Sequence, residues 1–530
     1  MSNKDNKIDY MYFISSIVLF ILHTLLLIYI KSSPESIDSI NSYCHEDLGG
    51  LFKFDSMGIS WLYISSFIIV FCQLVLLCRA EPSVFFFNKI RMPNLSGFTP
   101  RSSITWWVFY LFIIHLSLTF LFLTDNIIVF YISFETTLLP FYLWIGEAAV
   151  RNRRWHAAFF LVFFTLIGSI GMLWSICVLY KINNSFSISD YVNTYFRVRH
   201  GWYFKTHKLW YLEYFHLTEI PNLKEYFRVR DFRAGSVFYP DKLVKSAFFF
   251  FTFSFLIKFP VFPVASWLPE AHVEASTEAS VLLAAVLLKV APFGFYKIII
   301  PSFAVWYVEY CSYLWIIGLS SAIIYVFSLL VQTDLKRAIA YTSIIHMSIM
   351  LCLLGSTNKT SIDSAFLMGA LHSFCSAGLF CSIGYLYEKD KNKNLNYVSG
   401  LAETRPIFSS LFMLFNLVNV GYPLIGSYIS EILLFVVAED SKNRFYTFSV
   451  VLILYVLTSA VFFMMSKLFY RSWSGSDARK ILDLTRDEYF SLVILFVICV
   501  ILGLFPSIYL GYIEDSVADI IQLIQLSKRI

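Results

Sequence analysis

The chain has 530 residues, of which 58% are hydrophobic and only 15% are charged, whereas about a quarter of the residues of a soluble domain are charged. This composition excludes an ordinary soluble protein. It predicts an all-α, polytopic membrane protein, because the long apolar runs lack the alternating pattern of a membrane β-barrel. The formal net charge of +5 equals that of the segment 181–245 alone, so the rest of the chain is neutral and nucleic-acid binding is not indicated.

Runs of about 20 apolar residues predict about 13 transmembrane helices. They lie near residues 8–30, 57–78, 104–123, 126–147, 156–180, 246–268, 275–297, 306–331, 338–355, 362–387, 407–438, 447–470 and 489–513. The short segments on the side of the N-terminus are much richer in lysine and arginine than those on the other side. The positive-inside rule therefore places the N-terminus inside and the C-terminus outside.

Four parts follow one another along the predicted bundle. We expect N-terminal helices at 1–125, a first half at 126–300, a second half at 301–470 and a C-terminal loop and helix at 471–530. The first half carries the extramembrane insertion 181–245.

This insertion contains two related pieces, YFRVRH at 195–200 and YFRVRD at 226–231. Two interpretations stay open. The pieces are short amphipathic elements that dock on a neighbouring protein or on lipid headgroups, or they are a coincidence of composition, since two short copies are weak evidence for a repeat. The nine cysteines of the chain show no CxxC pattern and lie mostly in apolar spans, which predicts buried thiols rather than a metal site or a disulfide framework.

Two lysines lie inside apolar runs between residues 254 and 300. Lys258 is followed at once by Pro260 and Pro263, which interrupt its helix. A cation in the middle of a bilayer costs at least about 2.5 kcal/mol and normally faces a protein interior or water, so it marks an ion or proton path. The alternative is that a lysine near a helix end extends to the headgroups, which suits Lys297 better than Lys289.

Other ionisable residues also lie within apolar sequence. Glu135 and Glu431 have apolar residues on both sides, and His346 and His372 add imidazoles, which bind and release protons near neutral pH. Making or breaking a buried lysine–carboxylate pair changes the proton affinity of both groups, and Lys258 with Glu135 is a candidate for such a switch. For each carboxylate the alternative is a hydrogen bond between helices, and for each histidine a bond to a backbone carbonyl.

Several motifs resemble those of a known family. The run KFPVFPVASWLPEAHVEASTEASVLLAAVLLK at 258–289 is similar to the signature of subunit 4 of the proton-pumping NADH:ubiquinone oxidoreductase, respiratory complex I. These antiporter-like subunits are related to the Mrp-type cation/proton antiporters. Further matches are FETTLLPFYLW, DLKRAIAYTSIIHMSIM and ALHSFCSAGLFCSIGYLYE.

The resemblance implies a role for each of six residues. Glu135 corresponds to the essential helix carboxylate and Lys258 to its paired lysine beside the helix break. Lys289 corresponds to the central relay lysine. The remaining three positions are the connecting histidines and the terminal acid of the second half-channel, namely His346, His372 and Glu431.

The resemblance also implies a fold of two inverted five-helix repeats, each with a broken helix. Pro260 accounts for one break, and Tyr422, Pro423 and Gly426 for the other, just before Glu431. The chain departs from the family pattern in three ways. It has one helix where the family has two before residue 55, an additional acid at Glu278, and the insertion 181–245.

The resemblance finally implies a proton-translocating membrane-arm subunit in the mitochondrial inner membrane. No cofactor is expected in this chain, and NAD, FMN, iron–sulfur clusters and ubiquinone are expected in partner subunits. The expected partners are the other membrane-arm subunits, above all the flanking antiporter-like ones, and lipid. Two alternatives remain: a stand-alone Mrp-like cation/proton antiporter, and a structural subunit whose channel is vestigial.

Overall fold

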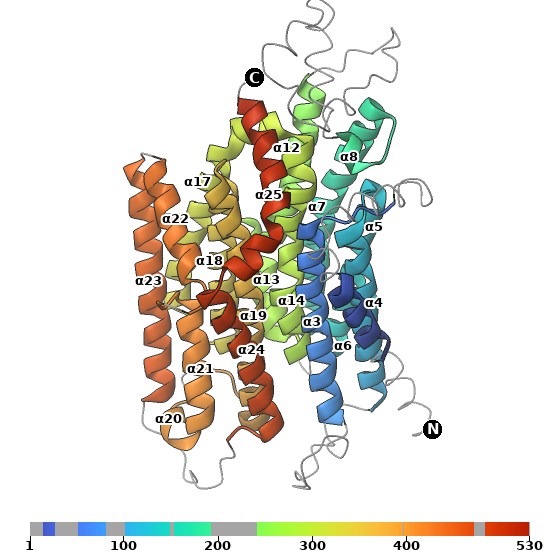
Figure 1. Ribbon diagram of the computed structural model, residues 1–530. Coiled ribbons are helices and arrows are strands. Elements are labelled where there is room, and N and C mark those ends of the chain that lie inside the picture. Colours follow the sequence, from blue (N-terminus) through green and yellow to red (C-terminus); the bar gives the residue numbers. More distant parts are fainter. Residues whose placement is uncertain are drawn as a thin grey trace, which may run out of the picture.

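The computed structural model describes nine stretches of the chain, and all structural statements refer to them. They are residues 14–26, 51–80, 101–148, 153–191, 241–395, 397–423, 425–441, 443–470 and 483–528. Within these stretches the protein is a bundle of helices that run along one common direction (Figure 1). The two copies YFRVRH and YFRVRD lie outside the described residues.

The predicted count of about 13 spans is not confirmed. In the described residues ten helices are long and apolar enough to cross a membrane, and two apolar helices, Ile14–Leu26 and Pro406–Asn419, are shorter. Two predicted spans, 246–268 and 407–438, are each divided by a break. The last predicted span, 489–513, is also wrong at its end, because a helix ends at Leu504 and the next one follows Pro506.

The first group of helices ends at Tyr191, so its last member, α8, lies within the predicted insertion 181–245. Pro140 interrupts the span that contains Glu135, since proline has no N–H to bond the carbonyl four residues earlier, and the chain turns at Thr137. The side chain of Asn126 caps the start of this span by accepting hydrogen bonds from two backbone N–H groups. The helices are α3 (Ser56–Ala80), α4 (Arg101–Leu123), α5 (Ile127–Thr136), α6 (Leu138–Ala148), α7 (Arg153–Asn183) and α8 (Ile188–Tyr191).

The first broken helix begins at Asp241, within the last residues of the predicted insertion. It consists of α12 (Asp241–Lys258), the short 3-10 turn Val264–Ser266 and α13 (Trp267–Glu274). Prolines 260 and 263 lie between the two parts and cannot donate the helical hydrogen bond. The glycines of α7 allow close packing here, because a Cβ on Gly168 would lie 3.3 Å from the backbone of Ser254.

The next span, Thr277–Ser302, is entirely buried inside the bundle. It is irregular at its centre, where α14 (Thr277–Ala285) gives way to the 3-10 turn Leu287–Lys289. Pro292 contributes to this irregularity, since it leaves the carbonyl of Leu288 without its helical donor. The span continues as α15 (Val290–Gly294), the π turn Phe295–Ile299 and α16 (Ile300–Ser302).

The second half of the bundle contains the second broken helix, α21 and α22, which are separated by residues 420–427. Capping side chains start three of its helices, Asp334 for α18, Asn443 for α23 and Thr485 for α24, the last in a capping box with Glu488. The helices are α17 (Ala304–Leu330), α18 (Leu335–Leu354), α19 (Lys359–Asp390), α20 (Leu401–Thr404), α21 (Pro406–Asn419), α22 (Tyr428–Asp440), α23 (Arg444–Phe469), α24 (Arg486–Leu504) and α25 (Ser507–Lys528).

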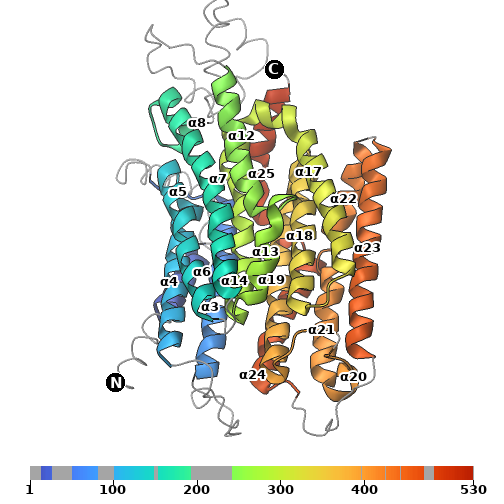
Figure 2. The same ribbon diagram turned by 180° about the vertical axis from the view of Figure 1, so that it is seen from behind.

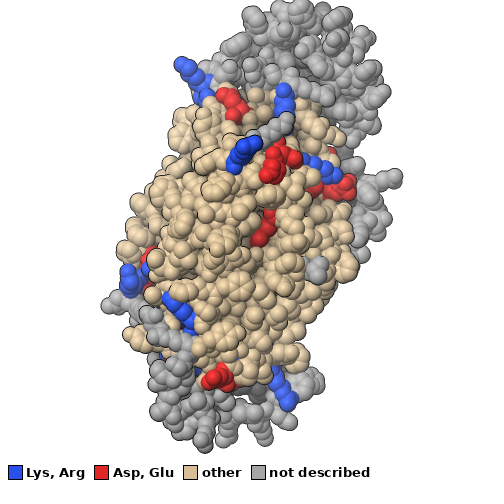
Figure 3. Space-filling view, turned by 90° about the vertical axis from the view of Figure 1, so that its left-hand side faces the viewer, with Lys and Arg blue, Asp and Glu red and all other residues tan. Residues whose placement is uncertain are grey.

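The two broken helices run in opposite directions, as expected for inverted repeats (Figures 1 and 2). The first starts at the end of the bundle that carries α8 and runs toward the end that carries α20, and the second runs the other way. On the face shown in Figure 3, charged side chains gather mainly toward the two ends, and a broad band between them is nearly free of charge. This distribution fits a protein whose middle lies in a bilayer.

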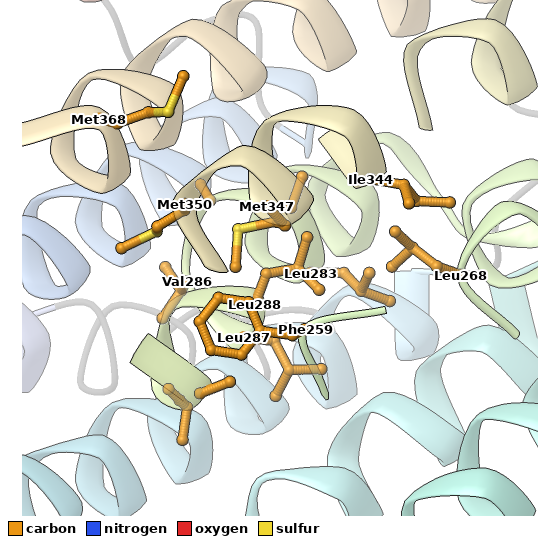
Figure 4. Packing of buried hydrophobic residues seen from close by; sticks show 14 of the residues in the cluster. Phe259, Leu268, Leu283, Val286, Leu287, Leu288, Ile344, Met347, Met350 and Met368 are labelled. Atoms are coloured by element: carbon orange, nitrogen blue, oxygen red, sulfur yellow. The ribbon is translucent and has the colours of Figure 1, made fainter. Parts of the chain in front are cut away.

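The core surrounds the irregular centre of the buried span. Figure 4 shows Leu283, Leu287 and Leu288 packed among apolar side chains that include Met347 of α18 and Phe259. All of these side chains are at most 2% exposed. Polar groups enclosed by this core are therefore shielded from bulk water.

Candidate functional site

Lys258 ends α12 at the first break. Its side chain is 1% exposed, and its Nζ atom makes no hydrogen bond within the described residues. The ammonium lies instead over the ring of Phe134, 3.2 Å from the ring centroid, which is a cation–π contact. Glu135 follows Phe134 in α5, is half-buried, and its Oε1 atom also has no hydrogen-bond partner there.

The predicted pair, Lys258 and Glu135, is therefore not joined by a direct hydrogen bond. We call this arrangement open. The two charges attract each other electrostatically, yet Lys258 is held over the neighbouring aromatic ring rather than bonded to the carboxylate. A direct hydrogen bond between the ammonium and the carboxylate would be a second, closed arrangement of this pair.

The centre of the site contains a direct contact. Lys289 Nζ lies 2.7 Å from His372 Nδ1 and donates a hydrogen bond of 2.6 Å to the carbonyl of Ala284. That carbonyl belongs to the last turn of α14, just before the irregular turn, and in a regular helix the backbone N–H four residues later would bond it. The rings of His372 and His346 are 5.3 Å apart, so three ionisable groups from three different spans lie side by side.

The second break holds Glu431. Its side chain is 7% exposed and accepts a hydrogen bond of 2.7 Å from the hydroxyl of Ser427. Gly421 makes room for the carboxylate, because a Cβ at this position would lie 2.2 Å from Glu431 Oε2. Asn419, the last residue of α21, lies near His346, but neither ring nitrogen of His346 has a hydrogen-bond partner within the described residues.

The prediction for Lys297 is wrong. We expected its side chain to extend to the headgroups, but it is 5% exposed and forms an ion pair with Asp55. Burial alone would raise the pKa of Asp55, yet the charges of Lys297 and Lys53 outweigh burial and hold that pKa below its ordinary value. The pair ties the buried span to the start of α3.

Two buried basic residues were missed from the sequence. Lys336 lies between the predicted spans 306–331 and 338–355, but in the structure it is in the first turn of α18, is 5% exposed and donates a hydrogen bond of 2.8 Å to the carbonyl of Ala275. His272 of α13 is completely buried. Two features of the sequence could have identified these residues. Asp334 marks the start of a helix, which places Lys336 inside a span. His272 lies within the 258–289 motif.

Comparison with known proteins places the chain in a family. The family described as "NADH:quinone oxidoreductase/Mrp antiporter, TM" matches residues 124–454, well over half of the chain. The chain belongs to this family. All six predicted site residues fall within the matched region, with Glu135 near its start and Glu431 near its end.

The similar proteins agree with this assignment. NADH-ubiquinone oxidoreductase chain 4 of Chondrus crispus is 27% identical over 399 residues, which cover 75% of this chain and 72% of the relative. The protein of the same name from Arabidopsis thaliana is 27% identical over 515 residues, 96% of this chain and 90% of the relative. A chain of respiratory complex I from Thermus thermophilus has the same fold, with a TM-score of 0.70 at 19% identity over 89% of this chain and 86% of that one.

Proposed function

We propose that this chain is a proton-translocating membrane-arm subunit of the mitochondrial NADH:ubiquinone oxidoreductase, and that its six buried ionisable residues form the proton path. The observation that carries the proposal is the contact between Lys289 and His372 at 2.7 Å. A lysine and a histidine bonded to each other inside a bundle share one proton more easily than they hold two. Such a pair is suited to pass a proton on.

The path begins at the first break and ends at the second. Glu135 and Lys258 exchange a proton when the ammonium leaves the ring of Phe134 and reaches the carboxylate. The proton then reaches Lys289, crosses to His372, and continues to His346, whose ring is 5.3 Å away.

Glu431 receives the proton at the far end. Ser427 holds its carboxylate at the start of α22, where the partial positive charge of the helix end favours the ionised form. When Glu431 releases the proton, its carboxylate is ionised again and can accept the next one.

The driving force comes from outside this chain. Electron transfer from NADH to ubiquinone takes place in partner subunits, which hold NAD, FMN, the iron–sulfur clusters and ubiquinone. A neighbouring subunit shifts the balance between the open and closed arrangements of Lys258 and Glu135, because a ligand or partner that favours one of two states changes their populations.

The test replaces Lys258 or Glu135 by alanine in the assembled complex. Each variant is expected to leave NADH oxidation and assembly in place but to lower the number of protons moved per electron. The measurement compares NADH oxidation with acidification of inverted membrane vesicles. An assembled variant that pumps fully contradicts the proposal.

The same preparation distinguishes the proposed function from two other functions. A stand-alone cation/proton antiporter is favoured by the shared family with Mrp antiporters, and it predicts that the chain purifies without other complex I subunits. A vestigial channel predicts that the Lys289→Ala complex keeps its full proton-to-electron ratio.

A further inference from the structure

A hollow opens between α17, α18 and α23, near the end of the bundle that carries α20 (Figures 1 and 2). It lies where α17 ends and α18 begins, and where α23 reaches its last turn. Apolar side chains form most of its wall, and its polar members are Gln332, Thr342 and Lys467. The positive-inside rule predicts that this end of the bundle is the inner one.

The wall of the hollow differs from the surface beside it. Leu329 and Met464, which line the hollow, are each only 7% exposed. The outer surface of α23 next to them is apolar and open, since Phe462 and Phe463 are 48% and 52% exposed. Apolar side chains exposed in this way on a membrane protein contact either lipid or another protein.

Lys467 lies at the edge of the hollow, in the last turn of α23. Its ammonium stands over the ring of Phe463, 4.2 Å from the ring centroid. None of the ion pairs in the described parts of the chain includes Lys467. The hollow therefore has a positive charge at its edge that no carboxylate of these parts balances.

The polar members of the hollow favour an anion. Gln332 uses one N–H of its amide on the carbonyl of Ser328, at 2.8 Å, and keeps a second N–H. The hydroxyl of Thr342 already donates to the carbonyl of Ile339. The free donors are thus an ammonium and an amide N–H, and no carboxylate lines the hollow. Such donors suit the oxygens of a phosphate group.

The charge distinguishes the two kinds of occupant. A helix of a partner protein would have to bring a carboxylate to the depth of Lys467, at the boundary of the membrane. A phospholipid brings a phosphate to this depth and an acyl chain to the apolar wall at the same time. Basic pockets between transmembrane helices on the inner side bind anionic headgroups in this way.

We propose that the hollow between α17, α18 and α23 binds one anionic phospholipid of the inner leaflet. Its phosphate lies at Lys467 and Gln332, and one acyl chain lies along α23 beside Phe463. This site is separate from the six relay residues, and its occupation does not depend on the proposed proton path. No covalent bond is made or broken.

The experiment counts the phospholipids that stay with the purified complex after washing in detergent. Mass spectrometry identifies the extracted lipids, and total phosphorus gives their number per complex. We expect Lys467→Gln to lose one anionic phospholipid per complex and Lys467→Arg to keep it, because arginine also binds phosphate. Ala460→Leu adds volume to the wall of the hollow without changing a charge, and it is expected to lose the same lipid.

A matched control is available at the other end of the bundle. Lys359 is 44% exposed and forms an ion pair of 2.7 Å with Glu514, so its charge is already balanced. Lys359→Gln is therefore expected to keep every bound phospholipid. NADH oxidation and the thermal midpoint of each variant show that the complex is assembled.

Rebinding identifies the source of the phosphate. The delipidated complex is mixed with vesicles of phosphatidylcholine, with vesicles of phosphatidylcholine and phosphatidylglycerol in equal amounts, or with inorganic phosphate. We expect it to regain one phosphatidylglycerol from the mixed vesicles only, and the Lys467→Gln complex to regain none.

Four results overturn the proposal. They are a full lipid count in the Lys467→Gln complex, equal filling by phosphatidylcholine, retention of inorganic phosphate without lipid, and a zero-length crosslink between Lys467 and a partner subunit. Lipid loss with full pumping supports the site and leaves the proposed function intact. Full pumping by the Lys258→Ala complex contradicts the proposed function and leaves the site intact, so the two failures are distinguishable.

Discussion

The two helix breaks hold charges of opposite sign on opposite sides of the gap. Lys258 is the last residue of the helix before the first break, and Glu431 is in the first turn of the helix after the second. Helix C-termini carry a partial negative charge and N-termini a partial positive one, and each favours a charge of the opposite sign by up to about 2 kcal/mol. Both charges therefore lie where the helix ends stabilise them.

The two breaks differ in how their charges are bonded. Glu431 has a hydrogen bond from Ser427 and a glycine that leaves room for it, so its position is fixed. Within the described residues the ammonium of Lys258 makes no hydrogen bond and lies over the face of an aromatic ring. If the proposed function is correct, this difference predicts that the charge at the first break changes its position during transport and that the charge at the second break does not.

The largest effect is expected for Lys258→Met, which removes the charge and keeps the volume. Proton transport through this chain is expected to stop. The thermal midpoint of the purified complex is expected to stay level or rise, because an unbonded buried cation costs at least about 2.5 kcal/mol. A clear fall of the midpoint would show that Lys258 has a stabilising bond and is fixed like Glu431.

Glu431→Gln is expected to stop proton release while changing stability by less than about 1 kcal/mol. Glutamine still accepts the hydrogen bond from Ser427, but it cannot bind and release a proton. The proton-to-electron ratio and the thermal midpoint, measured on the same preparation, test this. A normal ratio would remove Glu431 from the path.

Gly421→Ala is expected to act through both strain and crowding. Gly421 has a φ of +69°, and a Cβ there would lie 2.2 Å from Glu431 Oε2. A non-glycine residue in this conformation costs about 1–3 kcal/mol, so a lower thermal midpoint and partial loss of transport are expected. Gly511→Ala is the control, because a Cβ there has nothing within 4 Å and alanine stabilises a helix by about 0.5–1 kcal/mol.

The smallest effect is expected for Phe134→Leu at the first break. The cation–π contact is worth about 0.5–2 kcal/mol, and its loss favours the closed arrangement of Lys258 and Glu135. We expect a change of at most about tenfold to thirtyfold in the transport rate, since about 1.4 kcal/mol is a factor of ten. Stopped-flow measurement of vesicle acidification checks this, and an unchanged rate would mean that the ring does not hold the open state.

The local features of the site were predictable from the sequence. Proline at 260 and glycine at 426 interrupt helices for reasons that lie in their own backbone, so both breaks were predicted correctly. The apolar neighbours of Lys289 and Glu431 indicated burial, and both are buried. The prediction failed for Lys297 and Lys336, which lie near the ends of spans, where sequence alone does not separate an exposed lysine from a buried one.

The sequence by itself determined that this is a helical membrane protein with buried ionisable residues and two helix breaks, because apolar length, charge and proline act within one segment. Only the tertiary structure decided which groups meet. Lys289 and His372 are 83 positions apart, and Lys297 and Asp55 are 242 apart. Contacts of this kind depend on how the helices pack and how far each is rotated, and no local pattern of residues specifies either.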